Sequence, residues 1–379
     1  MPQMFRFERV LTPRGVLAAA EIEVDEGRIV AVRECQRPHE GFAGLWAVPG
    51  YVDTHCHGGA GVDFADPDAE AVAGAIAYHR GQGSTSIIAS TVTEPLDVLI
   101  DQVKRLRPLV ESGELAGIHL EGPFLAEAKK GAHEASLLRP PRQDYVAPLI
   151  EAGGGTVRMV TLAPELEHGM DSIRKFIDGG VKVAFGHSDA DAATARRSIE
   201  AGACIATHLF NAMRGIHHRE PGPVPELLRD PRVMVELVCD GVHLHPSVIA
   251  MAMDAAGPER VALVTDAMSA TGQPDGDYVL GALRVEVKAG VARLVTEDGR
   301  PGSIAGSTLT MAKAVEFVVG TVGRSLPEAA VMASTTPAAW HGLKDVGTLE
   351  PGKYADVCLV DDQGVLHGVL RRGEWIREV

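Results

Sequence analysis

The sequence predicts an α/β fold: a (β/α)8 TIM-type barrel with a small β-sandwich domain built from both chain ends. From Pro49 to about Met268, eight short apolar runs alternate with helical patterns, which is the element count of such a barrel. The two ends of the chain instead contain short strand-like runs broken by turns. A length of 379 residues accommodates one large barrel and one accessory domain.

The amino-terminal part predicts a small β structure. Within AEIEVDEGRIVAVREC, Glu26-Gly27 separates two strand-like runs, and the carboxyl-terminal residues 346–379 repeat this pattern. Two β-rich ends around one barrel predict that they pair with each other. We therefore expect residues 1–48 and 343–379 to form the β domain and residues 49–342 to form the barrel.

The eight apolar runs are continuous rather than alternating, which is typical of strands buried on both faces of a parallel sheet. They occupy residues 50–57, 84–91, 116–122, 157–164, 181–188, 204–210, 233–241 and 261–268. An open doubly wound sheet is the alternative arrangement. It is disfavoured because no glycine fingerprint follows the first run.

The segments between the runs predict helices. Asp66 as N-cap and Pro67 at the first helical position open one helix, which Gly81 closes. A second helix carries an apolar stripe of period 3.6, formed by Leu96, Leu99, Ile100, Val103 and Leu106.

Two more helices and an insertion complete the pattern. Ile173, Phe176 and Ile177 mark a helix that ends before Gly179-Gly180, and residues 246–257 form another. Residues 277–299 predict a β insertion in the barrel, with Ala289-Gly290 as its turn.

Composition excludes several partners. The chain has 51 acidic and 36 basic residues, a formal charge of −15, which argues against nucleic acid or an anionic membrane surface. No signal-peptide pattern and no bilayer-spanning apolar run is apparent. The five cysteines are scattered without a CxxC, as expected of free thiols in a reducing cytosol. We expect a cytoplasmic protein, in which any anionic substrate is bound by a local basic cluster.

Titratable residues gather where the predicted strands end. His55 and His57 point to the same face of the first strand because they are two residues apart; alone, such a pair equally fits a polar rim. The later strand ends add Glu121, His187, His208, Asp240, His243 and Asp266. The active site of a barrel lies at this rim, so the set predicts a metal site. Imidazoles with a carboxylate suit Zn²⁺ or Fe²⁺, whereas Ca²⁺ and Mg²⁺ prefer oxygen ligands.

Asp266, at the end of the last strand, is the candidate for proton transfer to and from a reacting water. A helix N-cap and a further metal ligand are alternative roles for this residue. Cys56 is expected to point away from the ligand face and to pack in the core.

A series of longer motifs runs nearly from end to end of the chain. They are HLEGPFL (119–125), KKGAH (129–133), GHSDA (186–190), THLFNAM (207–213), HREPG (218–222), DGVHLHP (240–246), VTDAM (264–268) and AGSTLTM (305–311). This order resembles the amidohydrolase superfamily, and within it the N-acetylglucosamine-6-phosphate deacetylase family. The tail GTLEPGKYADVCLVD (347–361) resembles the return of superfamily members to their small β domain.

The resemblance implies roles for the residues at the strand ends. Glu121, His187 and His208 correspond to the principal metal ligands, and His55 and His57 permit a second metal with Glu121 as the bridge. One or two divalent ions are therefore expected, with Asp266 as the general base that later protonates the departing amine.

The resemblance also implies substrate contacts and an oligomer. The implied substrate-binding residues are Ala132, His133, Asn211, Ala212, Arg219, Asp240, His243, Ile304, Ala305 and Gly306. Arg219 and His243 correspond to groups that meet the phosphate and are often offered by the neighbouring subunit, which implies a homodimer with sites completed across the interface. Without the flanking motif, the basic cluster 217–219 would be read as a solvated surface loop.

The expected function is metal-dependent hydrolysis of N-acetylglucosamine 6-phosphate to glucosamine 6-phosphate and acetate, in amino-sugar metabolism. The galactosamine epimer is the first alternative, since one hydroxyl contact decides between them. Cyclic-amide hydrolysis is disfavoured because the end of the fourth strand, VTLAPE (160–165), lacks the lysine that other amidohydrolases carbamylate. A non-catalytic barrel is disfavoured because no ligand position is lost.

Overall fold

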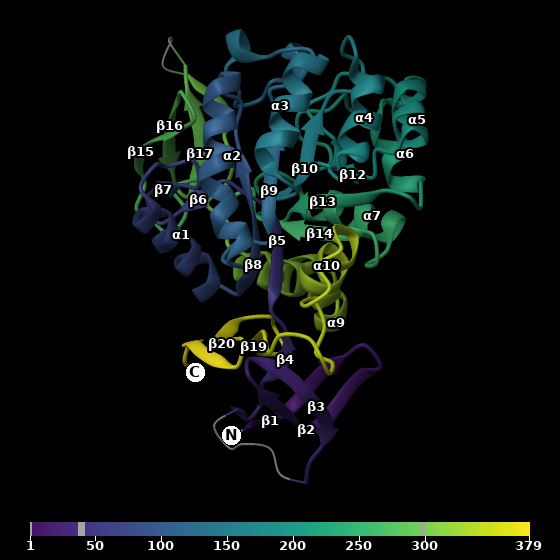
Figure 1. Cartoon of the computed structure of the whole chain (residues 1–379). Coiled ribbons are helices and arrows are strands. Elements are labelled where there is room, and N and C mark those ends of the chain that lie inside the picture. The colour runs from purple at the N-terminus through teal and green to yellow at the C-terminus, as the bar shows by residue number, and fades with distance from the viewer. Residues whose placement is uncertain (1, 37–41, 297–299) are drawn as a thin grey trace.

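The computed structural model describes residues 2–36, 42–296 and 300–379. A barrel surrounded by helices lies above a smaller β domain, and both ends of the chain belong to the latter (Figure 1). In the part of the chain that is described, no helix has both the length and the apolar character needed to cross a membrane.

The barrel contains eight parallel strands in sequential order. They are β5 (Tyr51–Cys56), β8 (Ser84–Thr91), β9 (Gly117–Glu121), β10 (Val157–Leu162), β11 (Lys182–Phe185), β12 (Ile205–Ala206), β13 (Met234–Val238) and β14 (Val261–Val264). The last strand meets the first: the backbone N–H of Asp266 donates to the carbonyl of His55 at 2.8 Å, and that of His57 to Ala267 at 2.8 Å. Each of the eight predicted runs contains one observed strand, so the predicted barrel is confirmed.

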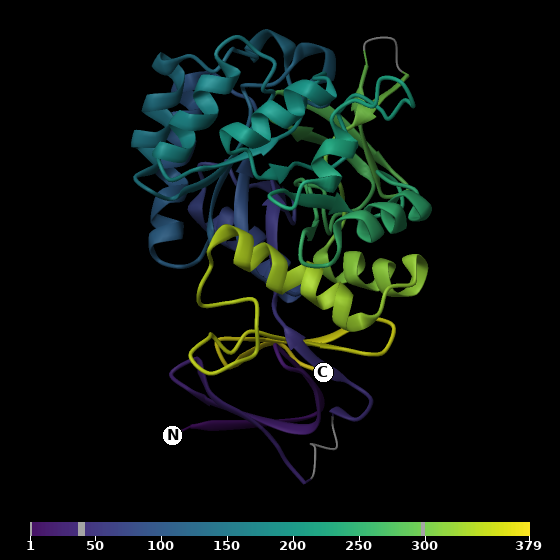
Figure 2. The ribbon, with the colours of Figure 1, turned by 90° about the vertical axis from the view of Figure 1, so that its right-hand side faces the viewer.

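Helices cover the outer face of the barrel (Figures 1 and 2). They are α1 (Ala69–Gly81), α2 (Leu96–Glu111), α3 (Gln143–Gly153), α4 (Gly169–Asp178), α5 (Ala192–Ala201), α6 (Val224–Arg229) and α7 (Pro246–Ala256). The apolar stripe of α2 is confirmed, because Leu99, Val103 and Leu106 are buried against the strands. In α4, Ile173 and Phe176 are buried as predicted, but Ile177 is 40% exposed.

The predicted start of α1 is wrong by two residues. The carboxylate of Asp68, not of Asp66, accepts the backbone N–H groups of Glu70 and Ala71 and caps the helix. Asp66 instead accepts the N–H of Asp68 in a turn before the helix, so Pro67 precedes the N-cap. The predicted end at Gly81 is confirmed.

An antiparallel insertion of four strands follows β14, where the sequence predicts a β insertion. They are β15 (Gly276–Leu280), β16 (Leu283–Lys288), β17 (Val291–Val295) and β18 (Pro301–Ile304). The turn at Ala289 and Gly290 is confirmed, with φ of 50° and 73°, values of a type I′ turn. Residues 297–299 of the predicted insertion lie outside the described residues.

The chain then forms α8 (Met311–Phe317), α9 (Leu326–Ala330) and α10 (Thr336–His341), separated by π-helical turns at Val318–Val322 and Val331–Thr335. In Figure 2 these yellow-green helices lie between the barrel and the β domain. Shorter elements complete the barrel side: the ribbon of β6 (Gly58–Gly59) and β7 (Val62–Asp63), and 3₁₀ turns at Glu127–Lys129 and Ala135–Leu137.

The chain ends pair as predicted, in one seven-stranded sheet of order β21-β20-β19-β4-β1-β2-β3. Its strands are β1 (Gln3–Thr12), β2 (Gly15–Asp25), β3 (Arg28–Glu34), β4 (Trp46–Pro49), β19 (Val357–Val360), β20 (Leu366–Arg371) and β21 (Glu374–Arg377). The ring centroids of Phe5 in β1 and Trp375 in β21 lie 6.3 Å apart although other strands separate them in the sheet. The sheet therefore folds over onto itself as a small sandwich. The boundaries at residues 48/49 and 342/343 stay predictions.

Candidate active site

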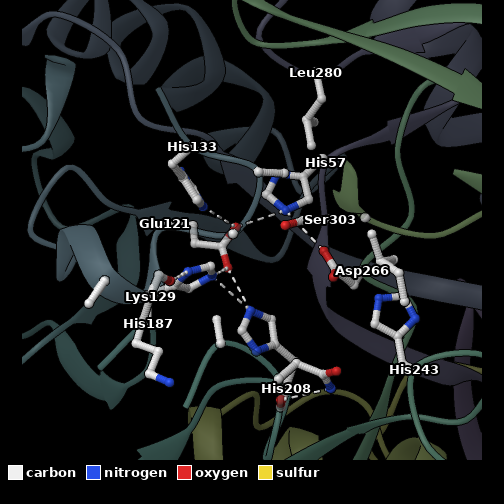
Figure 3. Close-up of a pocket in the computed structure, with 17 residues that line it drawn as sticks. His57, Glu121, Lys129, His133, His187, His208, His243, Asp266, Leu280 and Ser303 are labelled. Carbon is white, nitrogen blue, oxygen red and sulfur yellow. Dashed lines mark hydrogen bonds and ion pairs between the residues drawn. The ribbon is translucent and has the colours of Figure 1, made fainter. Parts of the chain in front are cut away.

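Imidazole and carboxylate groups converge at the carboxyl ends of the barrel strands (Figure 3). Nε2 of His208 lies 3.1 Å from Oε1 of Glu121 and 3.0 Å from Nε2 of His187. On the other side of the same carboxylate, Nε2 of His57 lies 3.2 Å from Oε2 of Glu121. Glu121 thus joins two groups of ligand-type atoms.

The second group contains His55, His57 and Asp266. Nε2 of His57 lies 3.2 Å from Oδ1 of Asp266 and 3.2 Å from Nε2 of His55. His55, His57, Glu121 and Asp266 are all buried, and one ligand atom from each lies within 4.8 Å of all the others. Asp266 is therefore close enough to be either a ligand or a base beside the ligands.

This set of donors fits a divalent metal. Two neutral imidazoles whose Nε2 atoms face each other at about 3 Å repel through their lone pairs, unless a proton or a cation lies between them. Such contacts occur twice in the cluster, at His55–His57 and at His187–His208. Nitrogen ligands with a bridging carboxylate match the preference of borderline divalent ions.

Both carboxylates of the cluster are ionised near neutral pH. Burial alone raises the pKa of Glu121, but the charge of His55 and hydrogen bonds from neighbouring imidazoles lower it well below its usual range. For Asp266, burial again opposes ionisation, yet the charge of His55 and a hydrogen bond from His57 bring the pKa to about 2. Positive charge on the imidazoles thus keeps both carboxylates ionised, and a bound cation would have the same effect on them.

Strained backbone marks the same rim. The φ angles of His187, His208 and Asp266 are 49°, 27° and 52°, in a region that residues with a Cβ rarely adopt. Each such residue costs on the order of 1–3 kcal/mol, which the surrounding structure must offset. The left-handed conformation interrupts the strand alternation at the strand ends. Strain of this kind concentrates at functional sites.

The cluster lies at the base of a cavity of roughly 400 Å³. Of the predicted site residues, twelve line it: His57, Glu121, Ala132, His133, His187, His208, Asn211, Ala212, His243, Asp266, Ile304 and Gly306. His55 lies beneath, fully buried. Ala305 is buried and does not line the cavity. Asp240 also lies outside the cavity, where its carboxylate accepts a hydrogen bond from Nδ1 of His243 at 2.7 Å.

Arg219 is placed elsewhere. It lies on an exposed loop and contacts Nε2 of His218 at 2.7 Å, not the cavity of its own chain. His243, by contrast, lines the cavity of its own chain. The expectation that Arg219 serves the site of a neighbouring subunit stays a prediction.

Several residues near the site were not predicted from the sequence. Leu280 and Ser303 line the cavity from the β insertion, which folds back over the barrel rim. Lys129, in the loop after β9, begins the KKGAH motif found in the sequence; it lines the cavity, and its backbone carbonyl accepts from Nδ1 of His187 at 2.8 Å. Glu236, in β13, contacts His55. The sequence feature that could have indicated it is a single acidic residue within an otherwise apolar strand.

Cys56 behaves as expected. Its thiol faces the carbonyl of Gly58 at 3.8 Å and Nε2 of His79 at 3.5 Å, away from the ligand cluster. Burial raises the pKa of this thiol well above its usual value, so it stays protonated and packs in the core.

Comparison with known proteins agrees with the motif resemblance. Residues 46–376 match the amidohydrolase family model. The chain is 38% identical to an N-acetylgalactosamine-6-phosphate deacetylase of Escherichia coli O157:H7, over 95% of this chain and 96% of the relative. It is 36% identical to an N-acetylglucosamine-6-phosphate deacetylase of Vibrio furnissii, over 98% and 94% of the two chains.

A solved structure is similar over almost the whole length. It is an N-acetyl-D-glucosamine-6-phosphate deacetylase variant from Mycobacterium smegmatis in complex with N-acetyl-D-glucosamine-6-phosphate, with a TM-score of 0.94 and 40% identity over 99% of both chains. The family model covers most of this chain, and the relatives exceed 30% identity over nearly all of it. The chain therefore belongs to the amidohydrolase family.

Proposed function

We propose that this protein hydrolyses N-acetylglucosamine 6-phosphate to glucosamine 6-phosphate and acetate, a step of amino-sugar metabolism. The observation that carries the proposal is similarity over nearly the full length to deacetylases of 6-phosphorylated amino sugars, together with an intact cluster at the strand ends. The cavity volume also lies within the usual range for small-molecule sites.

The protein requires a divalent metal in this proposal. Glu121, His187 and His208 would hold one ion, and His55 and His57 a second, with Glu121 between them; Zn²⁺ and Fe²⁺ suit these ligands best. When bound, such an ion lowers the pKa of a water molecule and polarises an amide carbonyl.

Asp266 and His133 supply proton-transfer and hydrogen-bonding groups. Asp266 removes a proton from the attacking water and returns it to the amine nitrogen as the C–N bond breaks. Burial lowers the pKa of His133 to about 4, so its imidazole is neutral. The backbone N–H of Thr93 donates to Nδ1 of His133, which places the imidazole proton on Nε2, beside Glu121 and the cavity. His133 therefore offers a neutral hydrogen-bond donor to the substrate.

Cationic groups around the cavity suit the phosphate. His243 lines the cavity; burial opposes its charge, but the hydrogen bond to Asp240 raises its pKa above the usual value. Among the described residues that line this cavity, Lys129 is the one lysine, and it supplies a second cationic group. We propose that Arg219 adds a guanidinium from a second subunit of a cytoplasmic homodimer, because it lies on an exposed loop outside its own cavity.

The galactosamine epimer is a second candidate substrate. It is favoured by the 38% identity to an N-acetylgalactosamine-6-phosphate deacetylase. The two epimers differ in the orientation of one hydroxyl group. If the site hydrogen-bonds that hydroxyl in one epimer, the other epimer leaves buried polar groups of the protein unpaired and is hydrolysed much less efficiently.

The test is acetate release from four sugars: both 6-phosphorylated epimers and both unphosphorylated N-acetyl sugars. We expect rapid release from N-acetylglucosamine 6-phosphate, loss of release after chelation, and recovery with Zn²⁺ or Fe²⁺. A higher kcat/KM for the galactosamine epimer would transfer the proposal to that substrate. No release from either phosphorylated sugar by metal-replete protein would refute it.

Replacing Arg219 with Ala is expected to raise KM for the phosphorylated sugar about 10- to 100-fold, since a charge-assisted hydrogen bond is worth about 1.5–3 kcal/mol. The value of kcat should change little, because the contact is remote from the amide. Arg14→Ala, in an exposed turn of the β domain, is the matched control. An unchanged KM in Arg219→Ala would remove this residue from the phosphate site.

A further inference from the structure

Glu236 carries a carboxylate deep inside the barrel. It lies in β13 between apolar neighbours, with an exposed fraction of 0%. A buried carboxylate without partners costs several kcal/mol, so its partners define what it does. Among the described residues, no lysine or arginine pairs with it; its ion-pair partner is His55.

The contacts of Glu236 reach both sides of the cluster. Oε2 lies 3.2 Å from Nδ1 of His55 and 3.4 Å from the backbone nitrogen of His208. The other oxygen, Oε1, accepts from Oγ1 of Thr54 at 3.3 Å. One carboxylate thus contacts the ring of one candidate ligand and the backbone of another.

The contact with His55 determines which ring nitrogen carries the proton. With a carboxylate at Nδ1, His55 keeps its proton on that nitrogen when a metal ion replaces the proton on Nε2, so that the lone pair of Nε2 faces the metal. Nε2 of His55 points at the cluster, 3.5 Å from Oε1 of Glu121 and 3.5 Å from Oδ1 of Asp266. The ring is therefore oriented as a metal ligand and made more basic by the charge behind it.

The other candidate imidazoles lack such a carboxylate. Nδ1 of His187 donates to the backbone carbonyl of Lys129, a neutral acceptor. Nδ1 of His57 and Nδ1 of His208 are buried without a hydrogen-bond partner in the described parts of the chain. The ring of His55 accordingly depends on Glu236 for its orientation, whereas the ring of His187 is held by Lys129. Glu236 contacts His208 only at the backbone nitrogen, from which a glutamine oxygen also accepts.

We propose that Glu236 is a positioning residue that enables the His55–His57 half of the cluster to bind metal. It acts by fixing the tautomer and orientation of His55, without contact with the substrate cavity, which other residues line. The inference rests on the metal requirement of the proposed function, but it concerns metal binding and not turnover.

The test compares Glu236→Gln with the wild type in the full-length protein. Zn²⁺ affinity is measured by competition with a chromophoric chelator, and Co²⁺ titrations followed by absorbance report the geometry of each equivalent. The amide keeps the shape of the side chain and removes its charge. We expect the metal equivalent held by His55 and His57 to lose about 10- to 100-fold in affinity, the usual effect of removing an outer partner of a metal-bound histidine. The equivalent held by Glu121, His187 and His208 should keep its Co²⁺ spectrum.

Two further variants serve as a control and as a substitute if Glu236→Gln does not fold. Glu286→Gln, a strand glutamate in the β insertion, is the matched control and should bind metal like the wild type. If Glu236→Gln does not fold, Glu236→Asp retains the charge while shortening the reach to His55, and we expect the same direction of change. Wild-type affinity for every equivalent in whichever variant folds would overturn the proposal. Because no substrate is present, failure of the proposed deacetylation would leave this test intact.

Discussion

Replacing Asp266 with Asn is expected to lower kcat by a factor of about 10²–10⁴ while metal content stays at the wild-type level. The carboxylate lies 3.2 Å from Nε2 of His57 and lines the cavity, and its pKa, lowered to about 2 by the neighbouring imidazoles, leaves it ionised near neutral pH. The amide of Asn fills the same space but accepts no proton from water and returns none to the amine.

Acetate release under saturating substrate, together with metal analysis of the same samples, measures both parts of this result. Asp277→Asn, on an exposed strand of the β insertion, is the control and should keep full activity. If Asp266→Asn loses metal in parallel with activity, Asp266 is a ligand and not a separate base. If it retains most of its kcat, the proton passes through another group.

Replacing His187 with Ala is expected to remove bound metal and activity together. Nε2 of His187 lies 3.3 Å from Oε1 of Glu121 and 3.0 Å from Nε2 of His208, so its loss opens one side of this group. Since loss of an outer partner alone costs about 10- to 100-fold in metal affinity, loss of a direct ligand should cost at least that much.

Metal content after dialysis and acetate release report the two effects of His187→Ala, and circular dichroism checks that the barrel persists. His367→Ala, on β20 of the β domain, removes an imidazole outside the cluster and should change neither quantity. Wild-type metal content in His187→Ala would contradict the ligand assignment.

The sequence was sufficient to predict the barrel because its strands are buried on both faces. Such strands need continuous apolar runs, and eight of these appear in the order in which the sheet uses them. The start of α1 shows where local reasoning stops. Asp66 and Asp68 are both residue types that cap helices. Asp68 is the cap because the free backbone N–H groups of the first turn, those of Glu70 and Ala71, point at its carboxylate.

The ligand cluster could be predicted from the sequence for a related reason. Parallel strands end at one rim, so residues at the ends of separate runs must meet there. Glu121, His187, His208 and Asp266 come from β9 or from the residues just after β11, β12 and β14, and the structure brings them together. Their assignment to a metal or to proton transfer stays a prediction.

The fold class and the rim on which the site lies could be predicted because burial patterns along the chain are local, and the β-rich character of both chain ends made their pairing the expected arrangement. Which distant side chains reach that rim depends on tertiary packing. Leu280 and Ser303 arrive through an insertion that folds back, Glu236 acts through a ring from another strand, and Arg219 turns outward. These placements depend on packing between segments far apart in sequence, which no local pattern encodes.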